Sequence, residues 1–354
     1  MSLIRETLDK ICPLDPEPGR IAQARLDSLT KPPGSLGHLE TIVRRYAAIR
    51  RDGGARRGRG AIAVFVADHG VANEGVSAFP QSVTVEMLRN IAGGGAAISV
   101  LARRFGYELR VIDTGVTLDT SVAPLAGVTY RRIGAGTRNL VHEPAMTDDQ
   151  ATRAIEIGVL IGRELAEAGV TMIGIGEMGI ANSTAAAAIL CAATGASPSA
   201  VAGRGTGLDD LGLERKIGVI EAALRLHRDS FKSAEALLAA VGGFDIAAMA
   251  GVCIAGAAAN VPVIVDGYIS TAAAVIAEKI YPGIFEYLFF SHRSGEGGHA
   301  LILDLLKVRP ILDLDLRLGE GTGAAIAMSV IEAALDLFHG MATFAGAGVP
   351  GKIR

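Results

Sequence analysis

One stretch near the C-terminus is the basis of the predicted fold: Asp313-Leu-Asp-Leu-Arg-Leu-Gly-Glu-Gly-Thr-Gly-Ala-Ala-Ile-Ala327. In the first half of this stretch, leucines alternate with charged residues, which is the pattern of a strand with one buried face. Three glycines then interrupt the alternation, and an alanine-rich helical run follows. A strand, a glycine turn and a helix start place backbone N–H groups where an anion can bind. We therefore expect a strand–turn–helix unit of an α/β protein here.

One carboxylate, Glu320, lies inside this turn between two glycines. Glycines let a ligand approach the backbone closely. A carboxylate does not help to bind a phosphate, so its presence in an anion-friendly turn indicates another task, and general base is the obvious one. The alternative is a surface glutamate that only favours the positive end of the following helix. The local sequence leaves both interpretations open.

Five further segments look like buried parallel strands because they are short, apolar and separated by helical stretches. They are residues 61–67, 109–112, 170–175, 261–265 and 287–290. Each ends on small or polar residues, at the edge where open α/β sheets bind their ligands. With the opening stretch as the sixth strand, we predict a doubly wound, mostly parallel, Rossmann-like sheet of about six strands in residues 61–340. Residues 1–60 form a predicted smaller helical region, joined by part of the C-terminal tail.

Composition narrows the function classes. The chain has 354 residues, a net charge of −3 and 5% aromatic residues, which argues against a nucleic-acid partner. Its three cysteines are widely spaced and form no C-x-x-C pair, so we expect no disulfide framework and a reducing, cytoplasmic location. No signal peptide is expected at the N-terminus. Two apolar stretches, residues 178–203 and 246–265, are interrupted by Asn and Pro, and we interpret them as buried elements and not as membrane spans.

Several common catalytic motifs are missing. The sequence has no G-x-S-x-G elbow, no H-E-x-x-H pair and no G-x-x-x-x-G-K-[ST] loop. Asp68-His69-Gly70 has no third ligand at metal spacing, so a turn or a substrate pocket is favoured over a metal site. Residues 174–179 match G-x-G-x-x-G, which keeps an NAD-dependent oxidoreductase as an alternative. That enzyme would need an acidic residue about 20 positions later, where residues 195–203 are not strand-like.

Several long motifs occur together and in order, and through them the chain resembles the nicotinate-nucleotide–dimethylbenzimidazole phosphoribosyltransferases. The motifs are Lys31-Pro-Pro-Gly-Ser-Leu-Gly, Ala67-Asp-His-Gly-Val, Glu74-Gly-Val-Ser-Ala-Phe-Pro-Gln, Gly174-Ile-Gly-Glu-Met-Gly-Ile-Ala-Asn-Ser-Thr, Gly203-Arg-Gly-Thr-Gly-Leu-Asp, Gly242-Gly-Phe-Asp, Ser291-His-Arg-Ser-Gly-Glu-Gly-Gly-His and Arg317-Leu-Gly-Glu-Gly-Thr-Gly. The resemblance extends from about Lys31 to Ala325. It implies a cytoplasmic homodimer with a Rossmann-like domain and a small helical domain.

The resemblance also implies an activity. Members of the family transfer phosphoribose from nicotinate mononucleotide to 5,6-dimethylbenzimidazole, which gives the lower-ligand nucleotide of cobalamin, and their general base falls on Glu320. Family positions that bind the benzimidazole fall on Phe79 and Met87. Some relatives carry Ser and Gln there, whereas this chain has two apolar side chains, so its base preference can differ.

The remaining candidate residues belong to the phosphoribosyl donor. For its phosphate we propose backbone N–H groups at Gly179 and at Gly321–Gly323, together with side chains of Lys216, Ser291 and Arg317. Lys216 could equally be a solvated lysine. Glu177 is the candidate for the ribose hydroxyls or a ring nitrogen, and Asp266 is a candidate for indirect support.

A non-enzymatic nucleotide sensor is the alternative from another functional class. It would keep the phosphate turns but would not need Glu320, so turnover of labelled nicotinate mononucleotide distinguishes the two.

The reaction implied by the resemblance predicts that no metal ion is needed. Nicotinate leaves the donor as a neutral ring and the donor carries a monophosphate, so the chemistry requires neither a cofactor nor Mg²⁺. We therefore expect EDTA to leave turnover of nicotinate mononucleotide intact, as measured by liquid chromatography of the products. A loss of activity in EDTA that one divalent ion restores would contradict this.

Overall fold

The main sheet has six parallel strands in the order β3-β2-β1-β4-β5-β6. The computed structural model describes residues 2–350. Its strands are β1 (Arg59–Ala67), β2 (Glu108–Gly115), β3 (Val128–Tyr130), β4 (Val170–Met178), β5 (Val263–Val265), β6 (Leu288–Phe290), β7 (His292–Arg293) and β8 (Leu312–Asp313). This order is that of the doubly wound dinucleotide-binding sheets. The predicted Rossmann-like α/β fold is therefore confirmed.

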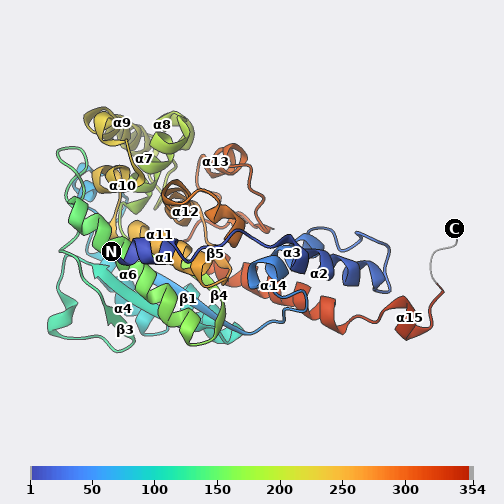
Figure 1. Cartoon of the computed structure of the whole chain (residues 1–354). Helices are drawn as coiled ribbons and strands as arrows, with labels where there is room; N and C mark the ends of the chain where they lie inside the picture. The colour runs from blue at the N-terminus through green and yellow to red at the C-terminus, as the bar shows by residue number, and fades with distance from the viewer. Residues whose placement is uncertain (1, 351–354) are drawn as a thin grey trace.

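Helices cover both faces of this sheet (Figure 1). They are α1 (Leu3–Leu8), α2 (Pro16–Ser28), α3 (His38–Arg50), α4 (Val83–Ala92), α5 (Ala97–Phe105), α6 (Asp148–Glu167), α7 (Asn182–Thr194), α8 (Pro198–Val201), α9 (Asp210–Leu226), α10 (Ala234–Val241), α11 (Phe244–Ala258), α12 (Tyr268–Ile280), α13 (His299–Leu305), α14 (Thr322–Gly340) and α15 (Phe344–Ala347). Four short 3₁₀ turns complete the described secondary structure: η1 (Gly70–Glu74), η2 (Thr120–Val122), η3 (Arg228–Ser230) and η4 (Ile284–Tyr287). Helices α11, α6 and α12 pack on one side, and α14, α4 and α5 contact the strands from the other.

One of the six predicted strands was wrong. The stretch after Leu312 does not join the main sheet, because only Leu312–Asp313 is a strand and it pairs with β7 in a separate two-stranded sheet. The expected buried face is also missing, since Leu314 is 55% exposed. The sixth strand of the main sheet is β3, a three-residue edge strand beside β2.

The tight contact between helices α6 and α11 depends on glycine. A Cβ atom built on Gly158 would lie 1.8 Å from the carbonyl oxygen of Ala248, and one on Gly251 would lie 2.0 Å from that of Ile155. Neither position can carry a side chain unless the helices separate. Residues of α11 are buried along the whole helix, so this contact lies in the core.

Helices α2 and α3 form a second group, far from α7–α10 in Figure 1, whereas α1 packs on α6 and α11. Helix α2 packs on α3, and α3 packs on α14. The segment after α2 meets the segment after α14 here, because the N–H of Thr30 donates to the carbonyl of Ala342 and Leu29 bridges to Thr343. These contacts support the proposed role of the C-terminal tail in the helical region, and the division at residue 60 stays a prediction.

The long apolar segments lie mostly inside the protein. The stretches around α7 and α11 are largely buried, as expected from the sequence. Among the described residues, α14 alone is long and apolar enough to cross a membrane by composition. It instead packs against β1, β4 and β5, with Met328, Ile331 and Leu335 buried.

Because α6 and α11 lie so close together, one added methyl group at Gly158 should clearly lower the stability of the protein. Gly158→Ala should lower the free energy of unfolding by roughly 1–3 kcal/mol, because the helices must move apart. Gly218→Ala is the matched control, since Gly218 lies in α9 with nothing within 4 Å of its added Cβ. The control should stabilise the protein by roughly 0.5–1 kcal/mol. Urea unfolding midpoints measure both, and equal midpoints for the two variants would contradict the packing argument.

Candidate active site

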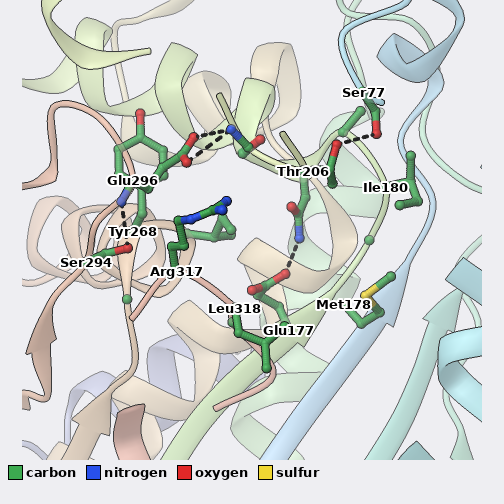
Figure 2. Close-up of a pocket in the computed structure, with 18 of the residues that line it drawn as sticks. Ser77, Glu177, Met178, Ile180, Thr206, Tyr268, Ser294, Glu296, Arg317 and Leu318 are labelled. Carbon is green, nitrogen blue, oxygen red and sulfur yellow. Dashed lines mark hydrogen bonds between the residues drawn. The ribbon is translucent and has the colours of Figure 1, made fainter. Parts of the chain in front are cut away.

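A cavity of about 300 Å³ opens at the carboxyl ends of β4 and β5 (Figure 2). Its lining comes from residues 76, 77, 79, 177–183, 205–206, 266–269, 292, 294, 296 and 317–319. These segments are far apart in sequence and meet because parallel strands end at one edge of the sheet. The lining combines apolar side chains such as Phe79 and Met178 with the carboxyl groups of Glu177, Asp266 and Glu296. The cavity can therefore hold a flat ring beside polar groups.

Glu177 is the first member of a buried series of hydrogen-bonded polar side chains. The Asn182 amide donates to Glu177, as drawn in Figure 2, and also to Asp245 at 3.2 Å. Asp245 in turn lies 3.0 Å from the ring Nε2 of His69. Burial raises the pKa of Glu177 to about 8, and the charges of Asp245 and Asp266 add to this, while the Asn182 hydrogen bond opposes it. At neutral pH this carboxyl group is mostly protonated.

Glu320 lies in an unusual turn immediately before α14. Gly319, Glu320 and Gly321 all have positive φ, at 87°, 63° and 87°. The left-handed region costs a non-glycine residue about 1–2 kcal/mol. Glu320 is 4% exposed, and the N–H of Ile98 at the start of α5 donates to its carboxyl group at 3.4 Å. Burial raises the pKa of Glu320, and this hydrogen bond opposes the shift.

Lys216 is buried beneath the cavity and is not a solvated lysine. Its exposed fraction is 0%. Its ammonium group donates to the Ser183 hydroxyl at 2.9 Å and to the Gly203 carbonyl at 3.0 Å, and it lies 3.8 Å from Glu296. Burial lowers the pKa of Lys216 to about 8, against the opposing charge of Glu296. Lys216 thus fixes the loop around Gly203 and Gly205, and the N–H of Gly205 also binds Glu296.

Comparison with known proteins identifies the family. A family model described as phosphoribosyltransferase matches residues 11–349. The chain is 47% identical over 349 residues to a nicotinate-nucleotide–dimethylbenzimidazole phosphoribosyltransferase of Geobacter sp. (strain M21), and 48% identical over 352 residues to that of Chloroflexus aggregans, with 99% of each chain covered. The chain belongs to this family. A crystal structure of the Thermus thermophilus enzyme of the same name matches with a TM-score of 0.89 at 43% identity, covering 96% of this chain and 100% of the other.

Among the residues predicted from the sequence for catalysis or substrate binding, four line the cavity: Phe79, Glu177, Gly179 and Arg317. Arg317 is exposed, and Figure 2 shows its side chain extending between Glu296 and Glu177 in this view. The other predicted residues do not line the cavity: Met87, Lys216, Ser291, Glu320, Gly321 and Gly323.

Two expectations for the phosphate of the donor lose support from this placement. The Ser291 hydroxyl is fully buried and already bound to the Asp266 carbonyl and to His292. The N–H of Gly321 donates to the Asp266 side chain at 3.2 Å. Groups that are already hydrogen-bonded inside the protein are poor candidates for a ligand.

Sequence reasoning missed two members of the site. Asp245 belongs to the quoted Gly-Gly-Phe-Asp motif, but nothing local indicates that it meets Glu177. Glu296 lies in the quoted motif that begins at Ser291, and its Gly-Glu pair recurs at Gly176-Glu177 and Gly319-Glu320, which was the signal that could have identified it.

The raised pKa of Glu177 predicts a pH dependence of stability. In the unfolded chain this carboxyl group titrates near 4.5, and in the fold it titrates near 8. Between these values the folded state holds the extra proton, so the free energy of unfolding falls as pH rises. Glu177→Gln should remove this contribution and flatten the slope by up to about 1.4 kcal/mol per pH unit. Urea unfolding between pH 5.5 and 7.5 measures it. Glu214→Gln, at an exposed site on α9, is the control, and an unchanged slope in Glu177→Gln would contradict the assignment.

Proposed function

We propose that this chain transfers the phosphoribosyl group of nicotinate mononucleotide to 5,6-dimethylbenzimidazole, with Glu320 as the general base. The products are α-ribazole 5′-phosphate and nicotinate, which makes it an enzyme of cobalamin nucleotide-loop formation. Relatives that carry this enzyme name match over 99% of the chain. The observation that supports the role of Glu320 is its burial on a strained turn beside the cavity.

The chemistry needs one base. In the donor, the pyridinium nitrogen is bonded to C1′ of the ribose, and that bond breaks as nicotinate leaves with the bonding pair as a neutral ring. A lone-pair nitrogen of the benzimidazole forms the new bond to C1′, which makes the incoming ring cationic. Removal of the proton from its other nitrogen neutralises it. In-line displacement inverts the anomeric centre from β to α.

Glu320 suits this proton transfer because of its surroundings. Burial disfavours the charged carboxylate and raises its pKa, which strengthens it as a base. The Ile98 N–H holds one carboxylate oxygen, which orients the group without protonating it. Glu177 has the complementary property, because a carboxyl group with a pKa of about 8 can donate a hydrogen bond at neutral pH. We propose that Glu177 binds the ribose hydroxyls or a ring nitrogen.

Arg317, Gly179 and Lys216 are the groups that we still propose for the phosphate of the donor. Arg317 is exposed at the cavity and can make a bidentate hydrogen bond to a phosphate. The Gly179 backbone lines the same cavity. Lys216 places a buried amino group next to the cavity. It donates a hydrogen bond to Ser183, which lines the cavity.

We also propose that the protein is a homodimer in the cytoplasm. The homodimer is a proposal that rests on the family resemblance. A cytoplasmic location stays a proposal that rests on the same resemblance.

Glu320→Gln tests the base. The variant should bind both substrates with nearly unchanged KM and lose about 10²–10⁴-fold in kcat, the usual contribution of a positioned general base. Product formation from nicotinate mononucleotide and dimethylbenzimidazole measures it. Glu332→Gln is the matched control, since Glu332 lies on the same helix but away from the cavity. Turnover at the wild-type level in Glu320→Gln would exclude the assignment.

The apolar wall at Phe79 predicts tolerance toward the base. Apolar walls discriminate a methyl-sized group by only about 1–3 kcal/mol, whereas a buried polar partner rejects non-matching bases much more strongly. We expect dimethylbenzimidazole to be preferred, with less substituted benzimidazoles used within about two orders of magnitude. Phe79→Ser should change the ranking of bases and retain turnover. Competition of two bases in one tube, scored by product ratio, measures this.

The control for this experiment is Val122→Ser, which changes an apolar side chain that is 83% exposed and outside the cavity. Its product ratios should equal those of the wild type. If benzimidazole is used far more than about two orders of magnitude less well than dimethylbenzimidazole, the prediction is wrong and a polar group selects the base by hydrogen bonding.

A further inference from the structure

The Glu320 turn is held in place by residues outside it. Gly319, Glu320 and Gly321 are all in the left-handed region, where a glutamate is disfavoured. The N-cap of α14 is Gly321, which has no side chain to cap the helix. Such a conformation persists only where its surroundings fix it.

Asp266, at the end of β5, supplies the missing cap from another part of the chain. One of its carboxylate oxygens accepts from the N–H of Gly321 at 3.2 Å, and the other accepts from the N–H of Ala324 at 2.8 Å. These partners are 55 and 58 positions away in sequence. Asp266 is 2% exposed, so water does not compete strongly for these bonds. Both oxygens are used by the first turn of α14.

The packing around this cap leaves little room for an alternative arrangement. A Cβ atom on Gly323 would lie 2.0 Å from Nδ1 of His292 and 2.9 Å from the Asp266 carboxylate. On the other side, a Cβ on Gly176 would lie 2.4 Å from the Gly321 nitrogen. The turn is therefore held between β4 and the Asp266 carboxylate. In this position the Glu320 side chain reaches the N–H of Ile98.

We propose that Asp266 is a positioning residue that acts on catalysis through Glu320, by capping α14 and fixing the strained turn that carries the base. This inference rests on the proposed function of Glu320. Asp266 also lines the cavity, so a direct contact with substrate is the competing role. The two roles differ in what they change, because positioning affects kcat and a substrate contact affects KM.

Asp266→Asn is the decisive variant, because it replaces one acceptor oxygen with an NH₂ group that cannot accept from a backbone N–H. We expect kcat to fall about 10–100-fold, since a displacement of about 1 Å can cost 10²-fold. KM for both substrates should stay within about threefold. In the Glu320→Gln background, Asp266→Asn should change the residual kcat by less than about threefold, because the base through which it acts is already absent.

The controls separate positioning from stability. Thr147→Ala removes the N-cap of α6, which does not line the cavity, and should lower stability while kcat stays at the wild-type value. Asp266→Ser, whose shorter side chain also leaves a single acceptor, is the second variant, and its kcat should likewise fall below the wild-type value with KM nearly unchanged. Circular dichroism establishes which variants fold.

Several outcomes would overturn the proposal. They are a wild-type kcat in folded Asp266→Asn, a raised KM with unchanged kcat, an equal loss of kcat with and without Glu320, and failure of both Asp266 variants to fold. The last would assign Asp266 to the stability of the fold. Failure of the proposed function gives a different result, because Glu320→Gln alone would then retain its turnover.

Discussion

The first turn of α14 lies directly on strand β4, and the geometry of the site depends on this contact. Gly176 has no side chain, and any Cβ there would lie 2.5 Å from the carbonyl carbon of Glu320. Gly174, two residues earlier, leaves space for Ala324 and Met328 of the same helix. A larger residue at either position would move the helix away from the sheet. The carboxyl group of Glu320 would move with it, so the packing of α14 on β4 determines the position of the proposed base.

The site also concentrates acidic groups in a buried place. Glu177, Asp245, Asp266 and Glu320 interact electrostatically and have almost no access to water. Four carboxylates could not all be ionised there without a large desolvation cost. The fold limits this cost in two ways: backbone N–H groups bind Asp266 and Glu320, and burial keeps Glu177 protonated at neutral pH. The described residues contain no acidic or histidine cluster suited to a metal ion. Burial nevertheless raises the pKa of Asp266 to about 7 and also raises the pKa of Glu320, against their backbone hydrogen bonds.

The wrong strand shows the limit of periodicity. Alternation of leucine with charged residues predicts a strand with one buried face, but a face is buried only if another element covers it. Nothing in the described chain covers Leu314, and the backbone leaves the strand after Asp313, with Asp315 at a φ of 54°. The true sixth strand, β3, has three residues of intermediate exposure and no apolar run. An edge strand with so weak a pattern is invisible to a search for buried strands.

The sequence by itself determined the sheet type and the family. Both follow from local patterns, namely apolar runs that end in glycine and polar residues, and motifs that occur in a fixed order. It also indicated Glu320, because a carboxylate between glycines is visible locally. Only the tertiary structure decided that Lys216 is buried, that Asp266 caps α14, and that Asn182 joins Asp245 across 63 positions. The physical reason is that burial and hydrogen-bond partners depend on which distant segments pack together, and no local pattern encodes that pairing.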